Sequence, residues 1–209
     1  MRSAESVSAG KRLILDAGES LIARHGFDAL RLRNIAAATG LSIGAIQHHF
    51  DTRDEAAVAM MRHSCAQRMT GWRSSMEGVD DAAQRLRVLL STAVSSREHC
   101  ALWLETCAAA TRHPALAPLI QETNDAWMSL LEEQMRQLHS VGRAPHVPGE
   151  PGSDESQVYL ASVAELLVIA VDGFVVSVGT RSTRVSAERA HVLLARTADV
   201  WLGTRLSAR

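Results

Sequence analysis

The 209-residue sequence predicts an all-α protein with about nine helices. Apolar residues recur at helical spacing along almost the whole chain. Ala-, Leu- and Arg-rich segments favour helix, whereas aromatic residues make up only 4% and no strand-like alternation is present. The hydrophobic share of 46% and the charged share of 22% exclude a disordered or collagen-like chain. We expect an N-terminal three-helix domain over residues 1–53 and a C-terminal helical domain over residues 54–209.

The first three helices are separated by glycine and by a capping serine. Leu13, Ala17 and Leu21 recur at i, i+4 and i+8, beside two isoleucines, and form the predicted apolar stripe of the first helix. Gly26 can adopt the positive φ that ends a helix. Ser42 can accept the free backbone amides at the start of the third helix. The predicted ranges are 8–25, 31–39 and 43–49.

A longer fourth helix is predicted from a capping box. Thr52 at the N-cap and Glu55 three residues later are the pair that stabilises a helix start. Further along, three Pro and three Gly within residues 142–153 predict a loop. The later helices are expected to cover residues 53–76, 81–96, 99–112, 119–140, 155–178 and 187–206, with Ser186 capping the last.

Cysteine usage and hydropathy predict a cytoplasmic protein. The three cysteines are odd in number and widely spaced, which does not indicate a disulfide framework. Residues 1–10 lack the apolar core of a signal peptide. Residues 158–178 are the one membrane-like stretch, and Glu165 and Asp172 interrupt it. We therefore interpret that stretch as a buried helix rather than a membrane span.

Residues 24–53, RHGFDALRLRNIAAATGLSIGAIQHHFDTR, carry the most specific pattern in the chain. Two short helices joined by Ala-Thr-Gly-Leu match a helix-turn-helix over about residues 31–50. The apolar residues Ile35, Ala36, Leu41 and Ile46 can lock the two helices together. Small residues at the start of the second helix would let its backbone approach DNA, and free amides there favour phosphate.

The stretch from Leu13 to Ala57 resembles the DNA-binding domain of the TetR/AcrR family of one-component transcriptional repressors. The resemblance rests on Arg-His-Gly-Phe, Arg-x-Ile-Ala, Gly-Leu-Ser and His-His-Phe in this order, followed by a basic residue three positions on. It implies a DNA-binding surface made of Arg31, Arg33, Ser42, Ile43, Gly44, Ala45, Gln47, His48 and Arg53.

The resemblance also implies a role for each part of that surface. Arg33 matches a residue that reaches the groove edge, and Gln47 and Arg53 match phosphate-positioning residues. The residues that match base readers are Ile43, Gly44, Ala45 and His48. Ile43 and Ala45 have an alternative role as spacer or core, and Arg53 as a solvated charge. A metal site at His48 and its neighbour is disfavoured, because adjacent helical residues point in different directions.

The chain departs from the family pattern at three positions. Leu30 stands where Thr or Ser is usual, so the phosphate-contacting cap of the second helix is missing or shifted to Arg31. Gln47 replaces a common Tyr, and Ile43 replaces a frequent Lys. These departures bear on the affinity for the DNA backbone and on the operator sequence that is read, and not on the presence of the motif.

The C-terminal part resembles the BetI-like branch of the same family, through segments around Trp103, Arg112, Trp127 and Asp172. The resemblance implies a homodimer formed by the last two helices and an enclosed effector pocket. Two apolar stripes suit a four-helix interface, with burial within one chain as the alternative: Leu160, Val163, Leu167, Ala170, Phe174 and Val178, and Ala190, Leu194, Ala198 and Trp201. The pocket candidates, each with core as the alternative, are Cys65, Met69, Trp72, Trp103, Cys107, Trp127 and Phe174.

These patterns predict a ligand-responsive repressor that binds a palindromic double-stranded DNA operator as a homodimer and is released by an unknown small-molecule effector. No cofactor, metal, membrane partner or enzymatic activity is expected. The net charge of −1 divides into +2 over residues 1–70 and −3 over residues 71–209, so the N-terminal part is mildly basic. The alternatives are a transcriptional activator, or an all-α small-molecule-binding protein or enzyme whose N-terminal domain has lost DNA binding.

Overall fold

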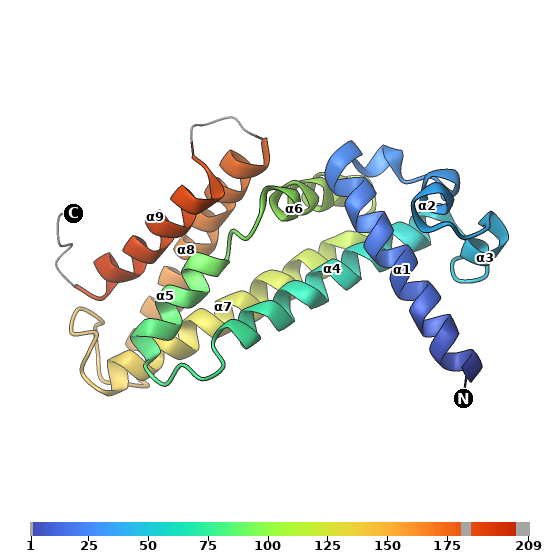
Figure 1. Ribbon diagram of the computed structural model, residues 1–209. Helices are drawn as coiled ribbons and strands as arrows, with labels where there is room; N and C mark the ends of the chain where they lie inside the picture. Colours follow the sequence, from blue (N-terminus) through green and yellow to red (C-terminus); the bar gives the residue numbers. More distant parts are fainter. Residues whose placement is uncertain (1, 181–184, 204–209) are drawn as a thin grey trace. The chain divides into compact units, whose positions relative to one another are not determined.

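The computed structural model describes residues 2–180 and 185–203, and within these ranges the chain forms nine α-helices, two 3-10 turns and no strand (Figure 1). The predicted all-α class is therefore confirmed. The elements in chain order are α1 (Arg2–His25), η1 (Phe27–Ala29), α2 (Leu32–Thr39), α3 (Ile43–Gln47), α4 (Arg53–Ser75), α5 (Ala82–Thr92), α6 (Arg97–Ala110), η2 (Pro114–Leu116), α7 (Ala117–Ser140), α8 (Asp154–Thr180) and α9 (Ala187–Trp201).

The chain folds into two compact units that do not follow the predicted boundary after residue 53. The first unit comprises residues 1–68 and 101–121, and the second comprises residues 69–100 and 122–209. The first thus includes the start of α4 and most of α6 as well as the helix-turn-helix. The division into a DNA-binding domain and an effector domain remains a prediction about function.

The core of the first unit corrects the predicted stripe of α1. Leu13 is 46% exposed, whereas Ile14 and Ile22 are fully buried. Gly18 lies on the buried side, and a Cβ atom there would come within 2.0 Å of the Met60 sulfur. Because Gly18 lets α4 approach α1 this closely, the buried stripe is rotated by one residue from the predicted one.

The predicted starts of α3 and α4 are confirmed. The Ser42 hydroxyl accepts a hydrogen bond from the Ala45 amide at 3.1 Å, as expected of an N-cap. The Thr52 hydroxyl accepts from the Glu55 amide at 3.1 Å. The Glu55 carboxylate accepts in return from the amide of Asp51, at 3.0 Å, one residue before the cap.

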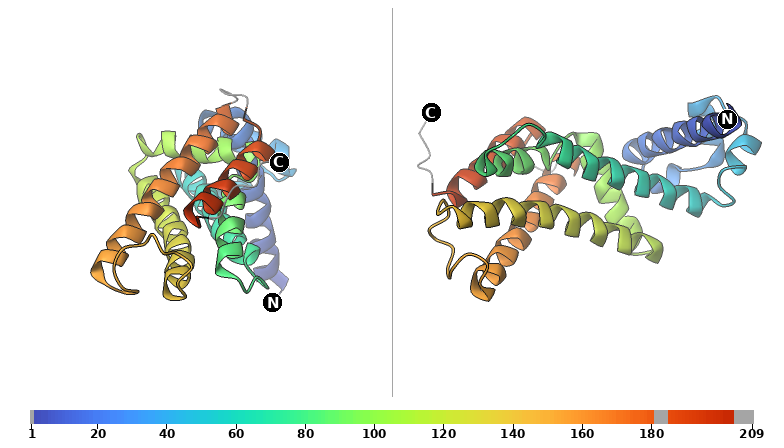
Figure 2. Two further views of the ribbon diagram at one scale, coloured as in Figure 1. Left: turned by 90° about the vertical axis from the view of Figure 1, so that its left-hand side faces the viewer. Right: turned by 90° about the horizontal axis from the view of Figure 1, so that it is seen from below.

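The second unit packs α9 against α5 and α8, as both views of Figure 2 show. Asp81 caps α5 by accepting from the Gln84 amide at 3.3 Å. A hydrogen bond from the Arg143 guanidinium lowers the pKa of Asp81, so the cap and this partner both favour the charged carboxylate.

Several helix ends differ from the predicted ones. α1 begins at Arg2, earlier than expected, and α5 ends at Thr92 rather than Ser96. α9 ends at Trp201, whereas the predicted end at Leu206 lies outside the described residues. Such shifts are common because helix ends depend on local capping more than on apolar periodicity.

α8 is the one described helix that is long and apolar enough to cross a membrane by length and composition alone. Buried positions account for 28% of its most apolar window. The interpretation of this segment as a buried helix is therefore incomplete, because one side of α8 is exposed among the residues that the structure describes.

Candidate DNA-binding and effector-binding sites

The helix-turn-helix is built around a left-handed glycine. Gly40 has φ +73° and ends α2, with its amide bonded to the Ala36 carbonyl oxygen. The Thr39 hydroxyl donates to the Ile35 carbonyl oxygen at 2.8 Å and accepts from the Leu41 amide at 3.2 Å. Ile35 and Ile46 are buried, as predicted for the residues that lock α2 to α3. The Ala-Thr-Gly-Leu segment thus fixes the angle between the two short helices.

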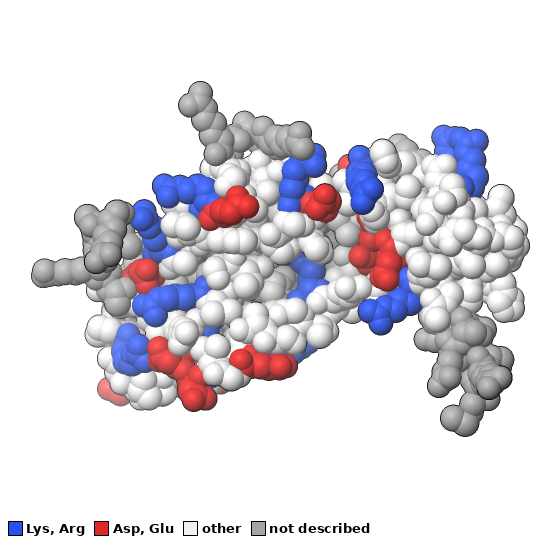
Figure 3. All heavy atoms as spheres, viewed as in Figure 1, with Lys and Arg blue, Asp and Glu red and all other residues white. Residues whose placement is uncertain are grey.

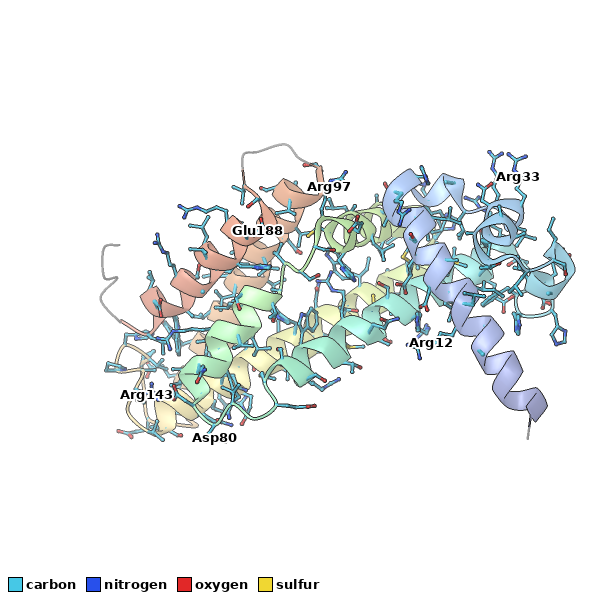
Figure 4. All side chains as sticks on the ribbon, in the orientation of Figure 1. Arg12, Arg33, Asp80, Arg97, Arg143 and Glu188 are labelled. Atoms are coloured by element: carbon cyan, nitrogen blue, oxygen red, sulfur yellow. The ribbon has the colours of Figure 1, made fainter. Side chains whose placement is uncertain are left out.

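The predicted DNA-reading residues of α2 and α3 lie on the surface of the first unit. Ile43, a large apolar residue, is 46% exposed at the first position of α3, so it is not a core residue. Figure 4 shows the Arg33 side chain projecting outward, and Figure 3 shows few charged groups over α2 and α3 in that view. The exposed members of the predicted set are Arg31, Arg33, Ser42, Ile43, Gly44, Gln47 and His48, and Ala45 is half-buried.

The missing cap of α2 is confirmed. Arg31 occupies the N-cap position, and its side chain makes no capping hydrogen bond. Leu30 is fully buried beneath the helix start. The Asn34 amide group instead donates to the Ala29 carbonyl oxygen at 2.7 Å, which ties α2 to the preceding turn.

Arg53 differs from its predicted place on the DNA-binding surface. It is half-buried, and its guanidinium donates to the carbonyl oxygens of Leu30 at 2.6 Å and Phe27 at 2.9 Å. The guanidinium also lies 5.6 Å from the centroid of the Phe27 ring. The side chain is therefore neither a solvated charge nor free to turn toward a phosphate without breaking these bonds.

The sequence gives no sign of a half-buried acid in α1. Burial, and secondarily the nearby charge of Asp16, raises the pKa of Glu19 to about 7. One of its carboxylate oxygens is buried and has no hydrogen-bond partner among the described residues. In the sequence Glu19 has the appearance of an ordinary polar residue between helical apolar positions, and only the packing of α1 reveals its environment.

Two of the predicted pocket tryptophans lie together in the second unit. Trp72 of α4 and Trp127 of α7 have ring centroids 6.2 Å apart, and both are buried. The indole N–H of Trp127 is buried and has no acceptor among the described residues. A buried donor without an acceptor is unfavourable, so an acceptor supplied from outside the chain would be stabilised there.

The other pocket candidates are placed as follows. Trp103 is buried in the first unit, with the Arg68 guanidinium 5.1 Å from its ring centroid. Cys65 is also buried there, and Cys107 of the same unit is half-buried. Met69 and Phe174, in the second unit, are half-buried.

The predicted dimer stripe needs correction, because this chain itself covers most of it. The intramolecular alternative holds for six residues that are buried within the second unit: Leu160, Leu167, Val178, Ala190, Leu194 and Ala198. Val163, Phe174 and Trp201 are half-buried, and Ala170 is exposed. Since α9 packs against α5 and α8 within the second unit, apolar faces of these helices can be buried without a second copy of the chain.

A different apolar face of α8 and α9 is exposed instead. On α8 it consists of Val158, Leu166, Ile169 and Val176, and on α9 of Val192 and Val200. The four α8 residues point to one side of the helix and form an exposed apolar strip, which polar residues interrupt. Such an exposed strip marks an interaction surface more often than a solvated one.

Two family models match the chain. The model described as "Bacterial regulatory proteins, tetR family" matches residues 14–60, and "BetI-type transcriptional repressor, C-terminal" matches residues 79–203. The HTH-type transcriptional repressor KstR2 of Rhodococcus jostii (strain RHA1) is 27% identical over 135 residues, which are 61% of this chain and 66% of that protein. The chain thus spans just under two thirds of the length of this curated relative.

Solved structures of the same fold cover almost the whole chain. One described as a TetR-family transcriptional regulator from Rhodococcus sp. is 25% identical, with a TM-score of 0.72, and the match covers 93% of this chain and 99% of that one. A transcriptional regulator from Saccharomonospora viridis in complex with choline is 21% identical, with a TM-score of 0.75, and the match covers 97% and 100%.

Proposed function

Because the chain belongs to the tetR family of bacterial regulatory proteins, we propose that it is a ligand-responsive transcriptional repressor. In this proposal it binds a palindromic operator as a homodimer, and a small-molecule effector releases it from DNA. Residues 1–53 act as the DNA-binding domain and residues 54–209 as the effector-binding and dimerisation domain. That the relatives are transcriptional regulators supports the proposal of a cytoplasmic protein that acts by binding rather than by catalysis.

The observation that carries the proposal is the exposed α3 of a fully formed helix-turn-helix. A helix of this kind enters the major groove with its first residues toward the base edges. Ile43 presents an exposed aliphatic side chain there, which suits contact with a thymine methyl group. Arg33 on α2 supplies the positive charge that the short α3 lacks. Ser42, Gly44, Gln47 and His48 complete the proposed surface, with Arg31 beside it.

Dimerisation is proposed through the exposed apolar strip of α8 together with α9. Glu165 lies on the exposed side of α8, and Arg189 and Arg196 lie on the exposed side of α9. If α9 of one copy meets α8 of the other, Glu165 of each copy would face an arginine of its partner beside the apolar strip. The twofold axis would make this pairing occur twice. Two DNA-binding domains held in this way can read half-sites about 34 Å apart.

The effector site is proposed beside Trp72 and Trp127. Their paired rings would stabilise a cation by its attraction to aromatic faces, and the free Trp127 N–H would bond an acceptor atom of the ligand. The choline complex of a protein with the same fold supports a small organic cation as the first class to test. Met69 and Phe174 are further pocket candidates in the second unit, and Cys65, Trp103 and Cys107 in the first.

Genomic selection of bound DNA fragments by the full-length protein tests the DNA-binding proposal. We expect an enriched palindrome whose half-sites are one helical turn apart. No enrichment would favour the alternative of a small-molecule-binding protein without DNA binding. The position of the palindrome relative to the promoter distinguishes a repressor from an activator.

Native mass spectrometry of the purified protein, before and after addition of choline, tests the effector proposal separately. A bound mass that is reduced in Trp127→Phe supports the site. A choline adduct that is equal in both proteins contradicts it. Addition of the bound compound to the protein–operator complex then shows whether it releases the DNA.

A further inference from the structure

The turn between α1 and α2 is held by a side chain from a distant helix. The Phe27 amide donates a hydrogen bond to a carboxylate oxygen of Glu105, at 3.1 Å, although the two residues are 78 positions apart in sequence. Glu105 is half-buried in the middle of α6, and Phe27 is almost fully buried. A hydrogen bond to a charged acceptor is stronger than a neutral one, and partial burial protects it from water.

The turn beside this carboxylate is made by a glycine. Gly26 has φ +78°, a conformation that residues with side chains rarely adopt. A Cβ atom at Gly26 would lie 3.4 Å from the same Glu105 oxygen, an ordinary van der Waals distance. The positive φ of the turn therefore requires the glycine, and the Glu105 carboxylate lies directly against it.

A residue just after the end of α6 also contacts Phe27. The His113 ring, just beyond the end of α6, lies 4.9 Å from the Phe27 ring between centroids. Arg53 of α4 donates a hydrogen bond to the carbonyl oxygen of Phe27. The N–H and the C=O of one residue are thus bonded to side chains of α6 and α4 respectively.

We propose that Glu105 is the positioning residue through which α6 fixes the α1–α2 turn, and with it the placement of the DNA-reading helices. A hydrogen bond of this length is lost when donor and acceptor separate by much more than half an ångström. A small displacement of α6 therefore breaks this hydrogen bond directly, without first moving α4, and leaves the Arg53 bonds from α4 in place. The consequence for DNA rests on the proposed function, whereas the hold on the turn does not.

Hydrogen exchange of the free full-length protein tests the hold on the turn. In Glu105→Ala we expect the Phe27 amide to exchange about ten-fold faster or more, because it loses a charged acceptor. Glu105→Gln keeps an oxygen at the same reach, so exchange should change less than about three-fold. Glu98→Ala, an exposed residue of the same helix, is the matched control and should leave the Phe27 amide unchanged.

Glu105→Asp tests whether the length of the side chain matters as well as its charge. It also replaces Glu105→Ala in the test if the alanine variant does not fold. It keeps the carboxylate but shortens the side chain by one methylene, so we expect fast exchange, as in the alanine variant. Unchanged exchange in both the Ala and Asp variants would overturn the proposal.

Affinity for the selected operator gives the second readout. We expect about ten-fold weaker binding for the Ala and Asp variants and rescue by Glu105→Gln. Faster exchange with unchanged DNA affinity would overturn the positioning role. If the unaltered protein selects no DNA at all, the proposed function fails, and the exchange data still decide whether Glu105 holds the turn.

Discussion

Arg53, at the first position of α4, donates from its Nε to the carbonyl oxygen of Leu30 at 2.6 Å. The second guanidinium bond, to Phe27, makes this side chain a brace between α4 and the segment that leads into α2. The family resemblance implied a phosphate contact at this position. In this chain a phosphate would have to compete with two backbone carbonyl groups for the same guanidinium.

Arg53→Ala should therefore reduce stability as well as DNA binding. Two partly buried carbonyl oxygens lose a charged donor, so the free energy of unfolding should fall by about 1–3 kcal/mol. Urea denaturation followed by circular dichroism measures this change. Arg33→Ala, which alters an exposed arginine of the same unit, is the control and should stay within about 0.5 kcal/mol of the unaltered protein. Equal stabilities of the two variants would refute the brace.

The half-buried Glu19 makes the stability of the protein depend on pH. Its pKa is about 7 in the folded protein and near the ordinary value of 4.5 in the unfolded chain. Between these values the unfolded chain loses the proton first, so stability falls as the pH rises through this range. Glu19→Gln stays neutral and should gain in melting temperature relative to the unaltered protein between about pH 5 and about pH 8.

Thermal unfolding at both pH values checks this expectation, and Glu98→Gln is the exposed control. Melting temperatures that change in parallel for Glu19→Gln and the unaltered protein would show that Glu19 is ionised normally.

Structural features that depend on residues close together in the chain could be predicted from the sequence. The caps at Ser42 and Thr52 and the turn at Gly40 follow from local hydrogen bonding, and all three are present. Apolar periodicity predicts the wrong stripe for α1, because a glycine does not register as an apolar residue. Gly18 nevertheless packs directly against Met60 of α4.

The contacts that define the candidate sites depend instead on residues far apart in the chain. The partners of Arg53 lie 23 and 26 positions away, and Trp127 meets Trp72 only through the packing of α7 on α4. The same reasoning explains the dimer stripe. Hydrophobic periodicity identifies an apolar helix such as α8, but it does not tell which side the chain itself covers.

A charged residue on the exposed strip of α8 should break the proposed homodimer. Ile169 and Val141 are both 67% exposed, but only Ile169 lies on this strip. Ile169→Glu should yield a monomer of 22.6 kDa, because it buries a charge at the proposed interface. Val141→Glu should remain at twice that mass. Light scattering after size-exclusion chromatography measures both, and a dimeric Ile169→Glu would place the interface elsewhere.

The indole N–H of Trp127 has no acceptor among the described residues, so its removal should cost little stability. Trp127→Phe keeps an aromatic ring against Trp72 and removes the N–H, so the ligand-free protein should lose less than about 1.5 kcal/mol of stability. Trp127→Ala should lose about 3–5 kcal/mol, because it leaves a cavity in the core. Denaturation curves of the two variants compare these costs. An equally large loss for Phe would show that the N–H has a partner in the folded protein.

The mobility shift of operator DNA by the full-length protein tests the central claim most directly. The fragments are the DNA upstream of the protein's own gene and those enriched by genomic selection, each measured at several salt concentrations. We predict a shift that weakens steeply with salt because phosphate contacts release counterions, and a salt slope smaller by about one in Arg33→Ala. If the unaltered protein shifts none of these fragments even at low salt, the protein is not a DNA-binding repressor.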